Sequence, residues 1–286
     1  MAEHYNIEKD LKVVVPSDIK QVFLVAKYDI LKHIRSKRLL AIGVILGLVL
    51  ALVTFLGTYN NPDPHNTAAF IGNFAGFAST LIIIGVTLFA GDAIVSEFQG
   101  RTGYLLFPNP VKKSSLYAGK FLASVGIMSL VIVVYYVIAI VIGLVYTGNF
   151  TELSIYSMLL ALMYGAAATG VAFLISSTMK TSTASLVLTF FMLFMILSLV
   201  SSVMSIAAIK PTGELTFEAG TISDIMKNPY PVDSVTNLSM GQNGSGGFAF
   251  HTYHDPVGPA VAVELVWLAA TYALGYVAFK RREMVS

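Results

Sequence analysis

Charged, proline and apolar side chains are closely spaced in one polar stretch of the sequence, residues 91–120. Two acids, Asp92 and Glu97, precede four bases, Arg101, Lys112, Lys113 and Lys120. Between them lie an apolar group and two prolines: Leu105, Leu106, Phe107, Pro108 and Pro110. An apolar tip that is flanked by charges and stiffened by proline is typical of a surface that docks on another protein. The stretch therefore predicts a protein-docking surface.

Glu97 and Arg101 are four residues apart, in the order that favours an ion pair on one helix. The alternative is a solvated charge at the end of a helix, which contributes about 0–1 kcal/mol.

Glu264 is a second candidate, because it is the one charged residue inside an apolar run of membrane-spanning length. An acid in such a place is a functional candidate by default, and Asn73 is expected at a similar depth. We expect these two residues to contact a substrate or a gate. The alternative is a glutamate that reaches the outer headgroups or stays protonated.

His251, His254 and Asp255 form a third pattern, since two histidines and a carboxylate suit zinc or copper. The pattern lies in a polar loop with no predicted helix to fix its spacing, and His-rich loops are usually only polar. We therefore predict no metal site. The sequence has no Cys, which excludes disulfides and thiolate ligands.

Six apolar runs must position these residues. A helix needs about 20 apolar residues to cross the hydrocarbon core, and the predicted spans are residues 39–58, 70–90, 121–146, 153–178, 183–209 and 257–279. The first five contain no Asp, Glu, Lys or Arg, and the sixth contains only Glu264. Tyr135, Tyr136 and Tyr164 fall at mid-span, where a buried hydroxyl needs a partner. We expect them to bond across helices.

The basic residues fall on alternate sides of these spans. Of the 18 Lys and Arg residues, all but Lys210 and Lys227 lie in the N-terminal segment, in residues 91–120, at Lys180 or in the C-terminal tail. Cytoplasmic segments are enriched in Lys and Arg. Both termini and residues 91–120 are therefore predicted to be cytoplasmic, in a multi-pass protein of the cell membrane.

Two further segments complete the predicted organisation. Residues 17–38 have apolar side chains at three- and four-residue spacing among many bases, which predicts an amphipathic helix in the inner headgroup layer. Residues 210–256 form the one sizeable outer loop, with no clear strand alternation, and are expected to be a small cap or short re-entrant helices. Gly43 with Gly47 and Gly72 with Gly76 permit close helix packing or a subunit interface.

Composition agrees with this fold class. The 286-residue chain is 56% hydrophobic and 12% charged, whereas soluble domains are about 25% charged. We predict an all-α membrane protein of six transmembrane helices preceded by an interfacial elbow helix. Residues 1–38 form a cytoplasmic segment and residues 39–286 the transmembrane domain. The lipid bilayer is the expected surrounding, and no nucleic-acid partner is expected.

Residues 97–120 also resemble the cytoplasmic connection in permease subunits of type-2 ATP-binding-cassette (ABC) exporters. The matching residues, in order, are Glu97, Gly100, Arg101, Thr102, Gly103, Leu105, Leu106, Pro108, Pro110, Gly119 and Lys120. The helix before the first span is similar to the family's elbow helix. The loop at 210–256 departs from the family in being longer.

The resemblance implies a division of labour between subunits. A separate ATPase would dock on residues 91–120, through Glu97, Gly100, Arg101, Thr102, Leu105, Leu106, Pro108, Pro110 and Lys120, and would hold ATP and Mg. A second permease copy or a related chain would complete the transporter. The sequence has no Gly-x-x-x-x-Gly-Lys-Ser/Thr phosphate loop, so no ATPase chemistry is expected here. A secondary transporter or channel, and a non-transporting scaffold, are the alternatives.

Overall fold

The computed structural model describes residues 17–60, 66–99, 112–239 and 247–282. Its helices are α1 (Asp18–Ile34), α2 (Lys37–Asn60), α3 (Thr67–Ala90), α4 (Val95–Gln99), α6 (Lys113–Thr147), α7 (Leu153–Thr178), α8 (Ser182–Phe191), α9 (Leu197–Ile206), α10 (Leu215–Glu218), α11 (Thr221–Asp224) and α12 (Val257–Arg281). A π-helical turn, η2 (Met192–Ile196), joins α8 to α9. The strands are β1 (Ser234–Ser239) and β2 (Gly247–Thr252).

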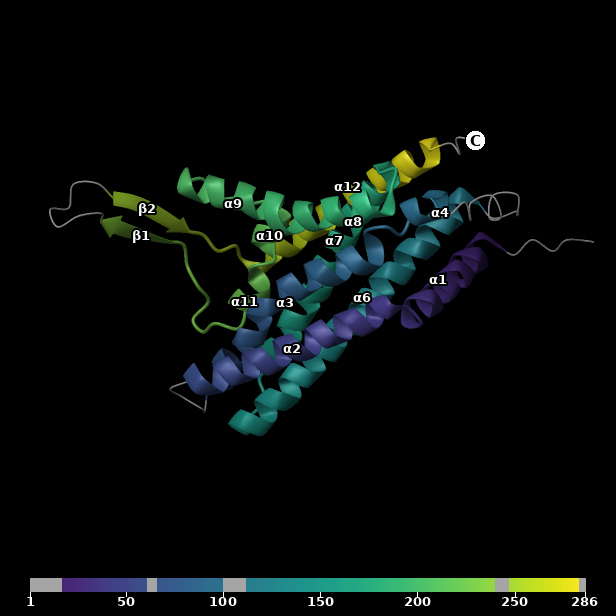
Figure 1. Cartoon of the computed structure of the whole chain (residues 1–286). Helices are drawn as coiled ribbons and strands as arrows, with labels where there is room; N and C mark the ends of the chain where they lie inside the picture. The colour runs from purple at the N-terminus through teal and green to yellow at the C-terminus, as the bar shows by residue number, and fades with distance from the viewer. Residues whose placement is uncertain (1–16, 61–65, 100–111, 240–246, 283–286) are drawn as a thin grey trace, which may run out of the picture.

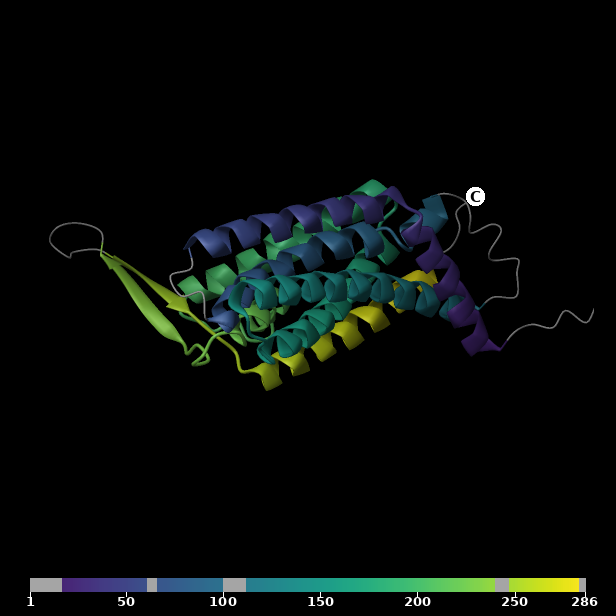
Figure 2. The ribbon, with the colours of Figure 1, turned by 90° about the horizontal axis from the view of Figure 1, so that it is seen from below.

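Six of these helical segments are long and apolar enough to cross a membrane, which confirms the predicted all-α membrane class. They are α2, α3 with α4, α6, α7, α8 to α9, and α12. The long helices run side by side as one bundle, with the β1–β2 hairpin at one end and α1 and α4 at the other (Figures 1 and 2). We call these the hairpin end and the α1 end.

The core of the bundle lies around α3 and α7, which bury most of their length. Both pack against α6, and α7 also packs along α12. Two predicted interhelical bonds of the tyrosines are confirmed: the Tyr135 hydroxyl donates to Phe74 O at 2.8 Å, and the Tyr136 hydroxyl lies 2.8 Å from Ser157 Oγ. The outer helices α2, α9 and α12 leave many apolar side chains exposed, as expected of helices that face lipid.

The segment before the first span forms two helices rather than one. The predicted helix over residues 17–38 ends at Ile34, and α2 begins at Lys37, so Lys37 and Arg38 belong to the spanning helix. Ser36 Oγ donates to His33 O at 2.7 Å in the break between them. Figure 2 shows α1 crossing the end of the bundle at a steep angle to α2. Its place in the headgroup layer stays a prediction.

The loop between α9 and α12 differs from the expectation. It contains the short helices α10 and α11, but also an antiparallel hairpin in which Ser234 pairs with Thr252 and Ser239 with Gly247. The expectation of a small cap or short helices was therefore incomplete, because it did not include the hairpin. Each strand has six residues and pairs only with the other among the described strands.

The glycine pairs also have different surroundings from those expected. A Cβ on Gly43 or Gly47 would meet no described atom within 4 Å, so this pair does not serve close packing within the described chain. A Cβ on Gly72 would lie 3.4 Å from Met226 Cβ, an ordinary contact.

Candidate functional site

The candidate site at the α1 end is built around a buried lysine. Lys120 lies in the second turn of α6 and is only 3% exposed. Its Nζ lies 2.7 Å from Glu97 Oε1 on α4 and 3.2 Å from Asp29 Oδ1 on α1. A buried ammonium group needs such partners, because its desolvation costs several kcal/mol. One side chain therefore joins three helices, and we call Lys120, Glu97 and Asp29 the buried ionic cluster.

Further basic groups surround Asp29 within this cluster. Lys32 Nζ lies 3.9 Å from Asp29 Oδ1 and 3.9 Å from Glu97 Oε1, and His33 Nε2 lies 3.6 Å from Asp29 Oδ2. Burial acts to raise the pKa of Asp29, whereas His33, Lys120 and Lys32 act to lower it, and the balance puts this pKa at about 2. Asp29 is therefore ionised at neutral pH and compensates the charge of Lys120.

Gly119 lets α1 approach α6 closely beside the cluster. A Cβ at this position would lie 2.7 Å from Val25 Cβ and 2.8 Å from Val22 O, closer than real Cβ atoms come. Gly119 and Lys120 together thus hold α1 against α6 in the structure, and of the two the resemblance attaches Lys120 to ATPase docking. Lys120 lies beneath the surface of the described chain, and its role in docking stays a prediction.

Side chains of α2, α7 and α8 hold the turn between α3 and α4 in place. Arg38 of α2 binds Asp92 through two hydrogen bonds of 2.7 Å each and donates to Leu88 O at 2.8 Å. Ser176 Oγ of α7 accepts hydrogen bonds from Ile94 N and Val95 N at 3.0 and 3.1 Å. Ser185 Oγ of α8 donates to Gly91 O.

The end of α4 is held as well. Gln99 Oε1 accepts from Ser182 N at 2.7 Å, and the Arg282 guanidinium lies 4.2 Å from the centroid of the Phe98 ring. Residues 91–99 therefore contact α2, α7, α8 and the end of α12.

Of the predicted docking residues, only Glu97 and Lys120 are among the described residues. Gly100, Arg101, Thr102, Leu105, Leu106, Pro108 and Pro110 lie outside them, and so does the predicted Glu97–Arg101 pair. Glu97 lies within ion-pair distance of Lys120 and Lys32. Sequence analysis missed the part played by Asp29, although an acid on a basic amphipathic helix was a usable signal.

The second candidate residue, Glu264, lies near the hairpin end of α12 and is fully buried. Neither of its carboxylate oxygens has a hydrogen-bond partner among the described residues. An ionised carboxylate without a partner would be very costly there, so Glu264 is expected to hold its proton. Tyr164 of α7 is also fully buried, and its hydroxyl has no partner in the described chain. Asn73, by contrast, is exposed on α3. The two residues that were expected to contact a substrate or a gate therefore differ, because Glu264 is buried and Asn73 is not.

Glu218 and Asp255 form an acid pair in the cap above Glu264. Glu218 Oε2 and Asp255 Oδ2 are both buried and lack a donor within the described ranges, and the two side chains lie within hydrogen-bonding reach of each other. Burial raises the pKa of Glu218 to about 7, and the charge of Asp255 adds to this increase. A single shared proton would satisfy both oxygens.

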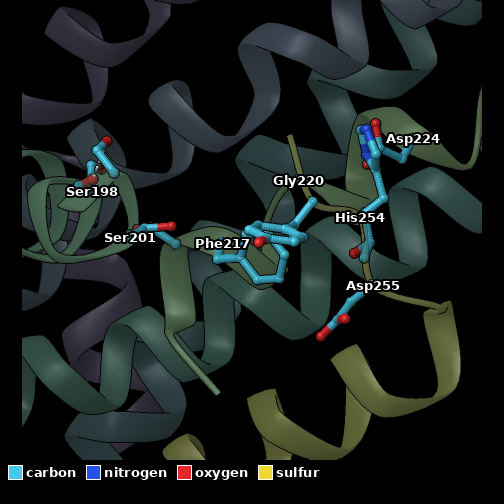
Figure 3. Close-up of a pocket in the computed structure, with 11 residues that line it drawn as sticks. Ser198, Ser201, Phe217, Gly220, Asp224, His254 and Asp255 are labelled. Carbon is cyan, nitrogen blue, oxygen red and sulfur yellow. Dashed lines mark hydrogen bonds and ion pairs between the residues drawn. The ribbon is translucent and has the colours of Figure 1, made fainter. Parts of the chain in front are cut away.

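The three residues of the histidine pattern, His251, His254 and Asp255, each contact a different partner. His254 Nδ1 lies 2.6 Å from Asp224 Oδ2, whereas Asp255 Oδ1 lies 2.9 Å from Lys210 Nζ. Figure 3 shows His254 and Asp224 side by side and Asp255 pointing away from them. The His251 ring stacks on Tyr253. Within the described residues no group of three such side chains is placed to hold a metal ion.

Figure 3 also shows the pocket that this pattern borders, which has a volume of about 370 Å³. Its walls are the serine-bearing face of α9, the helices α10 and α11, and residues 253–255. The lining is mainly polar: Ser198, Ser201, Ser202, Thr216, Phe217, Gly220, Thr221, Asp224, Tyr253, His254 and Asp255.

Six spans, and a segment at the end of the second one whose residues 91–99 are bound to α2, α7 and α8, define a multi-pass membrane protein. The chain belongs to the ABC-2 family of transporter proteins, whose profile matches residues 23–284. It is 28% identical to a probable ABC transporter permease protein, NosY, of Stutzerimonas stutzeri, over 92% of this chain and 99% of that relative. The chain is thus an ABC-2-type permease subunit, a class of membrane protein that works with an ATPase subunit.

Proposed function

We propose that this chain is the membrane half of an exporter whose separate ATPase docks on residues 91–120. In this proposal residues 39–286 form the permease domain, and residues 1–38 and the C-terminal tail lie in the cytoplasm, at the cell membrane. ATP and Mg bind to the ATPase, and a second copy of this chain or a related chain completes the permease. Export is the direction implied by the resemblance of residues 97–120 to exporters.

The distribution of charge supports this orientation. The basic helix α1, the turn between α7 and α8 and the end of α12 lie at the α1 end (Figure 1). Lys210, in contrast, pairs with Asp233 and Asp255, and Lys227 pairs with Asp224 of α11, in the loop that carries the hairpin. The positive-inside rule places the end richer in Lys and Arg in the cytoplasm. An ATPase that uses cytoplasmic ATP would meet residues 91–120 there.

The buried ionic cluster is the observation that best supports a role of this segment in coupling the ATPase to the permease. Glu97 lies two residues before the end of α4 and is bound to Lys120 of the next span and, through it, to Asp29 of α1. A force applied to residues 100–111 would therefore reach α4, α6 and α1 together. A secondary transporter working alone would be expected to carry more ionisable groups at mid-span than Glu264.

The test compares Glu97→Gln with the wild type in proteoliposomes that contain the permease and its ATPase. Glutamine keeps the size of the side chain but removes the charge that faces Lys120, so we expect weaker coupling between the subunits. The measurements are co-purification of the ATPase and vanadate-sensitive ATP hydrolysis stimulated by the permease, and both should fall severalfold. Asp233→Asn, which weakens the ion pair with Lys210 at the opposite end of the bundle, is the control and should change neither.

Unchanged coupling in a folded Glu97→Gln permease would remove Glu97 from the coupling site. Failure of the wild-type permease to stimulate any ATPase would contradict the proposed function itself and favour a non-transporting scaffold.

A further inference from the structure

A groove runs between α1 and α6 on the outside of the bundle, with a volume of about 450 Å³. On α1 it is lined at helical spacing by Phe23, Ala26, Lys27, Ile30 and Leu31, and on α6 by Leu122 and Gly126. Apart from the ammonium group of Lys27, this lining is apolar. The volume is within the range of small-molecule sites in proteins.

The groove faces the region where lipid is expected. Beside it α1 exposes large apolar side chains, since Phe23 is 62% exposed and Leu24 is 56% exposed. Leu122 is 43% exposed on α6, two residues after Lys120 of the buried ionic cluster. A helix with exposed apolar side chains and several lysines lies in the boundary between headgroups and acyl chains.

We propose that this groove binds an anionic phospholipid, with an acyl chain along Phe23, Ile30 and Leu122 and the phosphate paired with Lys27. The lining supplies one positive charge and contains no acid, so the charge complementarity favours an anionic headgroup over a zwitterionic one. Lys27 is exposed. Its flexible stem allows the ammonium group to reach the headgroup layer while the methylenes stay in the groove.

Gly126 provides a way to close the groove without disturbing the helices. It is exposed, and a Cβ there would meet only Ile30 Cδ1, at an ordinary distance of 3.7 Å. A leucine side chain at this position would therefore extend into the groove and occupy the space of the acyl chain. Gly43→Leu on α2 is the matched control, because a Cβ on Gly43 meets no described atom within 4 Å.

The test is native mass spectrometry of the purified permease, without an ATPase, titrated with phosphatidylglycerol and with phosphatidylcholine. We expect the wild type to bind phosphatidylglycerol about fivefold more tightly, the factor expected for one lysine at an anionic surface. Lys27→Ala should abolish that preference, and Gly126→Leu should remove the tightest lipid adduct of both kinds. Lys180→Ala, at an exposed lysine of the same end, and Gly43→Leu should behave as the wild type.

Equal affinity of the wild type for the two lipids would overturn the assignment of an anionic ligand, and retention of the adduct in Gly126→Leu would overturn the site. Lipid binding that appears only after deletion of residues 1–16 would show that the chain's own N-terminal segment fills the groove, and would also overturn the proposal. Because the measurement needs no ATPase, its failure leaves the proposed coupling role unaffected.

Discussion

Lys120 shows how one buried charge can organise the α1 end of a membrane bundle. Its ammonium group is removed from water, and within the described chain the carboxylates of Asp29 and Glu97 compensate its charge. These partners come from a helix before the first span and from the end of the second span. The charge therefore specifies how three separate segments meet, a role that an exposed lysine would not have.

Lys120→Met should destabilise the protein by about 3–5 kcal/mol, because it leaves two acids in a buried place without their main counter-charge. The measurement is chemical or thermal unfolding of the detergent-solubilised permease. The triple variant Lys120→Met, Asp29→Asn, Glu97→Gln should recover most of the loss, since no unpaired charge remains. A Lys120→Met protein as stable as the wild type would show that the cluster is not a structural link. Lys180→Met, at an exposed lysine, serves as the control and should change stability little.

At the scale of elements, the two ends of the bundle are held by different chemistry. At the α1 end, opposite charges and a close approach at Gly119 join α1, α4 and α6. At the hairpin end, acids dominate: Glu214 caps α10 by accepting from Thr216 N and Phe217 N at 2.8 and 2.6 Å, and Glu218 faces Asp255. Lys210 pairs with Asp255, whereas burial and the charge of Asp255 favour the protonated form of Glu218.

The cap at the hairpin end should therefore lose stability as the pH rises. The folded-state pKa of Glu218, about 7, is above its ordinary value of 4.5, so the folded protein holds the extra proton between these values. Its stabilising effect is complete below pH 4.5 and is lost as the pH rises through 7. One proton gives a slope of at most about 1.4 kcal/mol per pH unit.

This pH dependence is measured as unfolding temperature against pH between 5 and 8 for the wild type and for Glu218→Gln. The variant should show a shallower fall, because glutamine does not titrate and still donates to Asp255. His254, Asp224 and Lys210 also lie in this cap, but they are the same in both proteins, so the difference isolates Glu218. Parallel curves would contradict the shared proton.

At the scale of the whole molecule, the bundle is asymmetric along the membrane normal. Basic segments and both described ends of the chain gather at the α1 end, and the cap and hairpin project from the other (Figures 1 and 2). The proposed mechanism requires the α1 end to be cytoplasmic.

Single-cysteine labelling tests this orientation, because the natural chain has no Cys and each introduced thiol is unique. Lys112→Cys, whose parent side chain is 64% exposed, should react with a membrane-impermeant maleimide only after the cells are opened. Val232→Cys, at a 78% exposed position in the loop before the hairpin, should react in intact cells. The reverse pattern would put residues 91–120 on the outside and exclude docking of a cytoplasmic ATPase.

The spans were predictable from sequence because hydrocarbon imposes a simple requirement on each helix separately. Residues 153–178 were predicted as a span and form α7 with the same bounds, and α12 begins at the predicted residue 257. Such runs need only apolar length, and residues such as Glu152 and Asp255 with Pro256 bound them. The early start of α6 at Lys113 was not predicted, because residues 113–120 appear polar until Lys120 is known to be neutralised by α1 and α4.

The amino-acid sequence by itself determined the class of protein, the number of spans and the segment that connects the second to the third, because these follow from local hydropathy, local charge and a local motif. Only the tertiary structure decided that Asp29 meets Lys120, that Asp92 meets Arg38 and that Glu218 faces Asp255. Each of these contacts joins residues far apart in the chain. Their energy depends on burial and on distances of a few ångströms, which exist only once the helices have packed.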